Sequence, residues 1–190
     1  MNALASGIKK GFTFLELMVV ILILGIIATI AVPALQNRLP GYQRKQFIAE
    51  VDSLSRLAWQ EALVQQKALR LLFTLDKRLM SVQIATGGFD KDGNPTFAPV
   101  DIPYLKSSYQ WPDSIEIKQF FIGKKDFLTR PGIKTETIWF YYAPEGLVQP
   151  VIINMLDTSN QDAQGKARQI SLVMNPFTGQ FKEYEEFQKP

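Results

Sequence analysis

The side chains that could do chemistry in this chain are carboxylates, lysines and tyrosines, because its 190 residues include no cysteine and no histidine. This composition excludes Ser-His-Asp and Cys-His nucleophile systems, disulfide bonds and the common zinc sites. We therefore predict that the chain is not an enzyme and that it holds no cofactor and no metal.

A carboxylate at position 16 is unusual because the residues around it are apolar. Glu16 lies shortly after the basic sequence Lys9-Lys10-Gly11, inside an apolar run over residues 12–32. A carboxylate costs up to about 2.5–3.5 kcal/mol at the centre of a bilayer and less near its interface. Two interpretations remain open: Glu16 has a charged partner, or it is an interfacial carboxylate that reaches the lipid headgroups.

The apolar run is long enough to cross a membrane. At 1.5 Å per residue it forms a helix of roughly 30 Å, the thickness of a bilayer's hydrocarbon core, and the lysine pair favours a cytoplasmic N-terminus. We predict a transmembrane helix over residues 12–33. A secretory signal peptide fits less well, because its apolar stretch is about 7–15 residues long and ends in a small-residue cleavage site. A plain signal anchor remains an alternative.

Residues 10–17, with the sequence Lys-Gly-Phe-Thr-Phe-Leu-Glu-Leu, resemble the class III signal of type IV prepilins and pseudopilins. The resemblance implies that a prepilin peptidase removes a leader, residues 1–11, by cutting between Gly11 and Phe12, and then methylates the amine of Phe12. It also implies that Glu16 sets the register of a filament by pairing with a neighbour's terminal amine. Cleavage would place an ammonium group four residues before Glu16, at the positive end of the helix macrodipole, where a carboxylate is favourable.

Helix-breaking residues follow within and after the apolar run. Gly25 and Pro33 weaken the helix ladder, so we predict that the stretch between them can unwind when subunits pack. A simple proline kink at the membrane exit is the alternative. Pro40-Gly41 is a second breaker and argues against one straight, continuous helix.

Beyond these breakers the helical pattern returns. Apolar residues recur at three- and four-residue spacings with charged residues between them, which predicts an amphipathic helix from Tyr42 to about Gln66. We assign residues 34–66 to this periplasmic segment and expect its apolar face to lie on the head. The residues of that face are Phe47, Val51, Leu54, Ala58 and Ala62.

The remainder, residues 67–190, is predicted to form a β-rich head. Short apolar runs alternate with turn sequences such as Pro144-Glu145-Gly146, and such brief links favour antiparallel pairing against the helix. The fold class is therefore α+β, with a long N-terminal helix packed on an antiparallel sheet. The predicted strands are residues 69–75, 79–85, 114–121, 137–142, 151–155, 169–174 and 180–184.

The C-terminal half is similar to the head of the GspH/FimT family. The similarity lies in Ile138-Trp139-Phe140-Tyr141, the turn at Gly146, the strand around Ile170-Ser171-Leu172-Val173 and the sequence Thr178-Gly179-Gln180. It implies a pilin-like fold and a minor pseudopilin of the H type, a structural subunit of the type II secretion pseudopilus that helps export folded proteins. A type IV pilin or minor pilin is an alternative, although many of those close a C-terminal loop with a disulfide. A signal-anchored periplasmic enzyme or binding protein is another.

The same resemblance implies the location and the partners. The chain would lie in the inner membrane with its N-terminus in the cytoplasm and its head in the periplasm, and would then enter the pseudopilus. Its partners would be major and minor pseudopilins, the prepilin peptidase, the inner-membrane secretion platform and the lipid bilayer. Nucleic acid is not expected, because without Lys9 and Lys10 only 19 basic residues face 18 acidic ones.

Other groups of polar and aromatic residues receive structural interpretations. Residues 90–94, Asp-Lys-Asp-Gly-Asn, do not have EF-hand spacing and are predicted to form a turn, while Asp157, Asn160 and Asp162 are assigned to a polar loop. The acidic residues Glu183, Glu185 and Glu186 are predicted to be a solvated tail. Most of a set of strand aromatics are predicted to be core; these are Trp111, Phe120, Phe121, Trp139, Tyr141 and Tyr142.

We predict that processing removes the leader. Intact-mass analysis of membrane-extracted protein from cells that contain the peptidase should give a methylated chain that begins at Phe12. Gly11→Leu should block cleavage without blocking insertion, because the apolar run is unchanged. A mature chain that begins at Met1, or after Val32, would contradict the prepilin interpretation.

Overall fold

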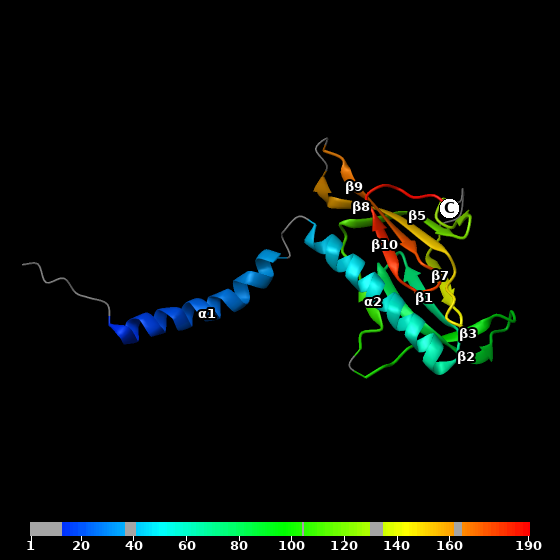
Figure 1. Cartoon of the computed structure of the whole chain (residues 1–190), viewed down its shortest axis with the longest axis horizontal. Helices are drawn as coiled ribbons and strands as arrows, with labels where there is room; N and C mark the ends of the chain where they lie inside the picture. Colours follow the sequence, from blue (N-terminus) through cyan, green and yellow to red (C-terminus); the bar gives the residue numbers. More distant parts are fainter. Residues whose placement is uncertain (1–12, 37–40, 104, 130–134, 162–164) are drawn as a thin grey trace, which may run out of the picture. The chain divides into compact units, whose positions relative to one another are not determined.

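The computed structural model describes residues 13–36, 41–103, 105–129, 135–161 and 165–190. The chain divides into two compact units, residues 1–39 and residues 40–190. In Figure 1 the first unit contains α1, and the second contains α2 and all the strands. Gly11 and Phe12, at the predicted cleavage site, lie outside the described residues.

The first unit contains one helix, α1 (Phe14–Gln36). The helix continues through both Gly25 and Pro33, so the predicted boundary at Pro33 falls inside it. Within the residues that the structure describes, no helix is long and apolar enough to qualify as a membrane span.

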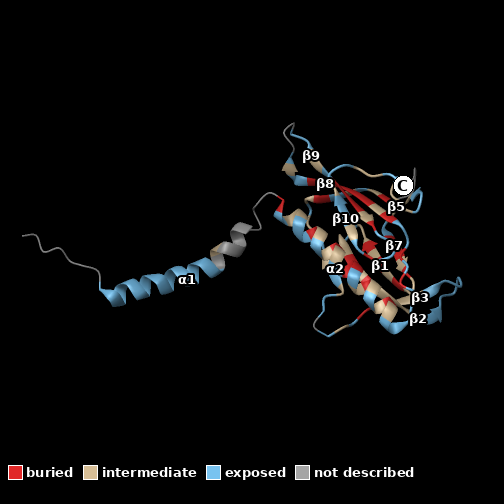
Figure 2. Cartoon of the chain, viewed as in Figure 1, coloured by how far each residue is buried: buried red, intermediate tan, exposed pale blue. Residues whose placement is uncertain are grey.

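The second unit begins with α2 (Tyr42–Gln65), which matches the predicted amphipathic helix. Gly41 precedes it with φ 78°, and Gln66 ends it with φ 52°. The N-terminal part of the chain is thus two helices, α1 and α2, and not one long helix. Every residue of the predicted apolar face, together with Ser55, is buried, as the red positions along α2 show in Figure 2.

Two antiparallel sheets, not one, make up the head. Sheet A has the order β3-β2-β1-β7, with β4 also paired to β2, and sheet B has the order β10-β9-β8-β5-β6. Sheet A comprises β1 (Leu69–Thr74), β2 (Leu79–Phe89), β3 (Pro95–Pro99), β4 (Ser108–Gln110) and β7 (Thr137–Tyr142). Sheet B comprises β5 (Ile115–Ile122), β6 (Lys125–Asp126), β8 (Val151–Gln161), β9 (Ala167–Met174) and β10 (Phe181–Tyr184).

Each predicted strand overlaps an observed one, and the predicted antiparallel pairing is confirmed. The short strands β3, β4 and β6 were not predicted. The strand β8 runs to Gln161, so Asp157 and Asn160 lie in a strand and not in the predicted polar loop. Asp162 lies outside the described residues.

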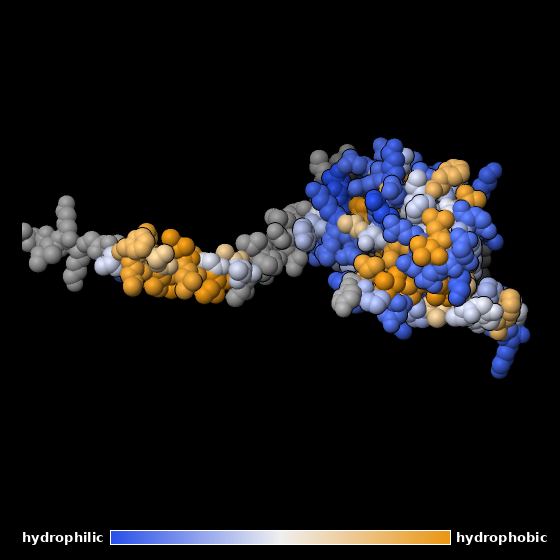
Figure 3. All heavy atoms as spheres, turned by 60° about the horizontal axis from the view of Figure 1, so that its bottom comes forward, coloured by the Kyte–Doolittle hydropathy of each residue, from blue (hydrophilic) through white to orange (hydrophobic). Residues whose placement is uncertain are grey.

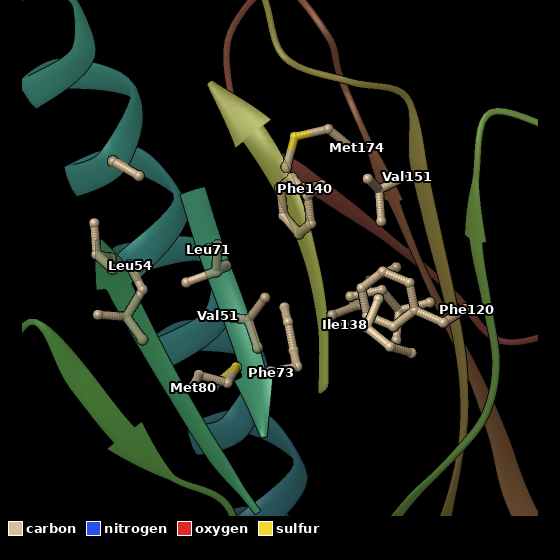
Figure 4. Packing of buried hydrophobic residues seen from close by; sticks show 14 of the residues in the cluster. Val51, Leu54, Leu71, Phe73, Met80, Phe120, Ile138, Phe140, Val151 and Met174 are labelled. Carbon is tan, nitrogen blue, oxygen red and sulfur yellow. The ribbon is translucent and has the colours of Figure 1, made fainter. Parts of the chain in front are cut away.

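The two sheets and α2 share one hydrophobic core (Figure 4). Phe73 of β1 lies 5.2 Å from Phe120 of β5, measured between ring centroids, and Phe140 of β7 lies 6.3 Å from Phe181 of β10. The helix joins the same core through Phe47, whose ring is 6.2 Å from that of Trp111. Each of these three elements therefore buries one face in the same core.

Two glycine turns hold α2 through Trp59. The indole Nε1 donates a hydrogen bond of 2.8 Å to the carbonyl oxygen of Gly146. A Cβ atom on Gly179 would lie only 2.8 Å from the Cβ atom of Trp59, and Gly179 has φ +65°. The Thr-Gly turn therefore needs glycine for two reasons, its backbone conformation and the close approach of the helix.

A buried chain of hydrogen bonds links β7, α2 and the turn between β9 and β10. The hydroxyl of Tyr142 donates to Ser55 Oγ at 2.8 Å, and Ser55 Oγ donates to the carbonyl oxygen of Gly179. Burial raises the pKa of Tyr142, so its hydroxyl stays protonated and remains a donor. Because each of these buried groups has a partner, the hydrogen bonds fix how β7, α2 and the β9–β10 turn pack together.

We predict that Gly179→Ala destabilises residues 40–190 more than Gly123→Ala. Gly123 also has a positive φ, of 59°, but a Cβ atom there would meet nothing within 4 Å. Both substitutions strain the backbone, but only Gly179→Ala also crowds Trp59. This crowding should lower the unfolding free energy by a further amount of about 1–3 kcal/mol. Urea unfolding measures both losses; equal losses would mean that the approach to Trp59 is not a constraint.

Candidate assembly site

The start of α1 is capped by Thr13. Its Oγ1 accepts a hydrogen bond of 3.2 Å from the backbone N–H of Glu16, and its carbonyl oxygen accepts one of 3.1 Å from the N–H of Leu17. The sequence Thr-x-x-Glu is the pattern of a helix capping box. The role of Thr13 was not predicted from the sequence, although the Thr-x-x-Glu pattern indicates it.

Glu16 lies in the first turn of α1 and is exposed in the single chain. The first turn carries the positive end of the helix macrodipole and unpaired backbone N–H groups, so a carboxylate is favourable there. In the sequence Glu16 follows Phe12, the predicted processed terminus, by four residues. Its pairing with a neighbouring subunit stays a prediction.

The described side chains of α1 are almost all apolar and exposed. Phe14 is 76% exposed and Ile21 is 61% exposed, and Figure 3 shows hydrophobic residues covering the described part of the helix. A helix that is apolar on all sides needs an apolar surrounding, such as lipid or other helices. Glu16 is the acidic residue of its first turn, and the helix has no basic residue in its last turn.

The two predicted helix-breaking residues lie within α1, which stays helical at both. A Cβ atom at Gly25 would meet nothing within 4 Å, so packing within the described chain does not require glycine there. Unwinding between Gly25 and Pro33 when subunits pack therefore stays a prediction.

The acidic sequence around Asp90 forms a turn, as predicted. The Asp90 carboxylate accepts hydrogen bonds from the backbone N–H groups of Asp92 and Asn94, at 2.9 and 2.8 Å. These bonds, that of Asn94 first, lower the pKa of Asp90 because they favour its charged form. Among the described residues, no group of three or more acidic side chains lies close enough together to hold a metal ion.

The C-terminal acidic residues Glu183, Glu185 and Glu186 are exposed, as predicted, but Glu183 lies in β10 and two of the three form ion pairs. Glu183 forms an ion pair of 3.7 Å with Arg44 of α2, and Glu185 pairs with Arg168 of β9. The backbone N–H of Gln188 donates to Asn154 Oδ1 at 3.2 Å, so the tail is also tied to sheet B. These contacts make the tail part of the head.

The strand aromatics divide into two groups. Trp111, Phe120 and Tyr142 are buried, as predicted for core residues. Trp139 is 37% exposed. Phe121 and Tyr141 are half-buried, so the core assignment does not hold for these three residues.

Comparisons with known proteins agree with the N-terminal features and with the fold. Residues 8–32 match the family described as the prokaryotic N-terminal methylation motif. A fimbrial protein of Pseudomonas aeruginosa is 38% identical over 61 residues, which cover 32% of this chain and 39% of that protein. The type IV major fimbrial protein FimA of Dichelobacter nodosus is 39% identical over 49 residues, 26% of this chain and 31% of that protein. The chain thus matches less than half the length of these curated relatives.

A solved structure extends the comparison to the head. The minor pseudopilin EpsH from the type 2 secretion system of Vibrio cholerae matches 74% of this chain and 95% of its own, with a TM-score of 0.50 and 12% sequence identity. The likeness concerns the fold. This chain has the N-terminal motif and the fold of type IV pilin-like proteins. The methylation motif includes Thr13, Glu16 and Gly25, and α2 and the two antiparallel sheets follow it.

We predict that Thr13→Ala frays the start of α1 in this pilin-like protein. The loss of the cap should cost about 0.5–2 kcal/mol, and the amides of Glu16 and Leu17 should exchange faster with solvent. Thr29→Ala is the matched control, because Thr29 Oγ1 donates to the carbonyl oxygen of Ile26 at 2.7 Å in the helix interior. Hydrogen exchange of the full chain in detergent micelles measures both, and unchanged exchange in Thr13→Ala would show that Thr13 is not the cap.

Proposed function

We propose that this protein is a minor pseudopilin, a structural subunit of a type II secretion pseudopilus, and that it catalyses no reaction. The observation that carries the proposal is the likeness of fold to EpsH, which extends over 95% of that minor pseudopilin. The methylation motif at residues 8–32 supports it independently, because it concerns the part of the chain that precedes the head.

In this role α1 acts first as a membrane helix and then as an assembly helix. The leader, residues 1–11, is removed by a prepilin peptidase, and the new amine of Phe12 is methylated. Lipid covers the apolar surface of α1 until neighbouring helices replace it in the filament. The chain lies in the inner membrane with its head in the periplasm, and its partners are sister pseudopilins and the secretion platform.

Glu16 supplies the register in this proposal. A carboxylate in an apolar surrounding is penalised unless a positive charge neutralises it, and the terminal amine of the adjacent subunit is such a charge. Because the attraction is strong at low dielectric and falls with distance, one axial offset between helices is favoured over others. A plain anchor helix has no comparable need for a carboxylate at this position.

A type IV pilin or minor pilin is the second candidate. The curated relatives favour it, since they are fimbrial proteins. The absence of cysteine from the chain argues against the pilins that close a C-terminal loop with a disulfide. Copurification of the chain from its native membrane would distinguish the two systems, because secretion pseudopilins would accompany a pseudopilin and pilus subunits would accompany a pilin.

We predict that Glu16→Val is inserted and processed but does not assemble. The substitution raises the hydrophobicity of α1, so insertion and steady-state abundance should survive. A terminal amine left unpaired in the filament core costs on the order of 3–5 kcal/mol, and about 1.4 kcal/mol is a factor of ten in an equilibrium constant. The variant should therefore be depleted at least about tenfold from complexes with sister subunits.

The measurement is crosslinking to sister subunits in the membrane, normalised to the amount of processed protein. Glu16→Gln is the matched control, because it removes the charge while keeping the size and a polar group. Both variants should fail to assemble if the charge matters. Normal crosslinking and secretion with Glu16→Val, at normal processing, would reclassify α1 as a plain anchor.

A further inference from the structure

One face of sheet A points away from the shared core. Residues of β1 alternate, so Leu69, Leu71 and Phe73 are buried while Arg70 and Leu72 lie on the opposite, outer face. Strand register places Tyr141 of β7 opposite Arg70, and Trp139 opposite Leu72. The outer face therefore carries two of the aromatic residues that did not enter the core, Trp139 and Tyr141.

An arginine lies among these rings. The Arg70 guanidinium carbon is 4.2 Å from the ring centroid of Phe97 and 5.2 Å from that of Trp139. The rings of Phe97 and Tyr141 are 5.8 Å apart, and Trp139 Nε1 donates to the Tyr141 hydroxyl at 2.8 Å. We call Arg70, Phe97, Trp139 and Tyr141 the arginine–aromatic cluster.

The charge of Arg70 has no carboxylate partner among the described residues, whose ion pairs all involve other side chains. Its Nε donates to Gln83 Oε1 at 2.8 Å, and the Tyr141 side chain also interacts favourably with the guanidinium. Neither partner is an anion. Burial lowers the pKa of Arg70, because it penalises the charged form. A carboxylate would remove this penalty, and arginine is the side chain that best matches a planar carboxylate.

The cluster lines a hollow of about 510 Å³, together with Asn94 and Thr96 of the β2–β3 hairpin. Asp90 is also on its rim, and the hydrogen bonds that its Oδ1 accepts from its own turn keep its carboxylate charged, which favours the approach of an acidic side chain from the side of β7. A second hollow of about 220 Å³ lies beside the first and shares Trp139 and Tyr141 with it. Its lining is apolar and includes Ile122, Phe127 and Ile138.

The edge of β7 between these hollows has open backbone groups. In an antiparallel pair, residues point their N–H and C=O groups alternately toward and away from the neighbouring strand. The N–H of Leu75 bonds the carbonyl of Glu136, and the N–H of Gln149 bonds the carbonyl of Tyr141. Thr137 and Trp139 alternate with residues that bond β1, so their backbone N–H and C=O groups point away from β1. Among the described residues, no backbone group bonds them on that outer side.

We propose that this edge of β7 and the arginine–aromatic cluster form a docking site for an extended peptide segment of a partner protein, in which acidic and apolar residues alternate. The segment pairs with Thr137 and Trp139 as an added strand. Its apolar side chains enter the 220 Å³ hollow. Its acidic side chains lie over the outer face and reach Arg70.

The observations favour a peptide over a small anion. A free anion would use Arg70 alone, whereas the open N–H and C=O groups of β7 complement a polypeptide backbone, as in other complexes formed by strand addition. An added strand lies about 10 Å, or two strand spacings, from β1. The Arg70 side chain leans toward β2 and β3, where it contacts Gln83 and Phe97, but its guanidinium carbon also lies 5.2 Å from the ring centroid of Trp139 in β7. An extended glutamate side chain of the added strand that lies over β7 approaches the guanidinium from that side. The proposed site uses only residues of the head, so it would exist in a pilin or a pseudopilin alike.

The test uses the full chain in detergent micelles and a panel of capped six-residue peptides that alternate valine with glutamate, beside the same peptides with glutamine. Glutamate peptides should bind about tenfold more tightly than glutamine peptides. Hydrogen exchange should show protection of residues 137–139 when peptide is bound. Arg70→Gln should abolish the preference for glutamate, and Arg70→Lys should retain part of it, because lysine keeps the charge but not the planar geometry.

Lys182→Gln is the matched control, because Lys182 also stacks on an aromatic ring, that of Tyr184 at 5.2 Å, but in sheet B. This variant should bind the peptides like the parent chain. Three results would overturn the proposal: no panel member binds at millimolar concentration; glutamate and glutamine peptides bind equally; or acetate competes fully while residues 137–139 gain no protection. The last result would indicate a small-anion site in place of strand addition.

Discussion

Burial of the apolar face of α2 is the interaction on which the head depends. The helix places Phe47, Val51 and Leu54 in the core that the two sheets share. Its polar contacts then select one arrangement, because Ser55 and Trp59 bond turns that lie far away in the sequence. Hydrophobic burial supplies most of the driving force, while these hydrogen bonds and the close approach of Gly179 fix where the helix lies.

The two helices differ in how their apolar residues can be buried. The apolar residues of α2 occupy one face, so a folded head can bury them within a single chain. The described residues of α1 are apolar on all sides, and no single face can be buried to satisfy them. This difference explains why one helix belongs to the head's unit while the other needs lipid or neighbouring subunits. The described part of α1 carries one carboxylate, that of Glu16, and charges interact more strongly where water is excluded.

The two faces of β7 lie in different surroundings, one in the core and one on the outer face of sheet A. Along β7, Ile138, Phe140 and Tyr142 are buried, while Trp139 and Tyr141 lie on the outer face with Arg70. An exposed sheet edge with aromatic neighbours can pair with another chain and aggregate, unless something covers the edge or keeps it short. Gln149 covers one end of β7 by bonding both backbone groups of Tyr141, whereas no described residue bonds the outward backbone groups of Thr137 and Trp139.

The sequence alone determined the features that depend on local spacing. The apolar run of α1, the buried face of α2 and most strand positions follow from periodicity, which neighbouring residues set by themselves. Glu16 was recognisable because its charge contrasts with the residues beside it. Only the tertiary structure decided the features that depend on distant pairing. These include the division into two sheets, the short strands β3, β4 and β6, and the pairing of Glu183 with Arg44. Trp139 and Phe140 are adjacent aromatics in a strand, and only the register of β7 against β1 and the position of α2 decide which of them is buried.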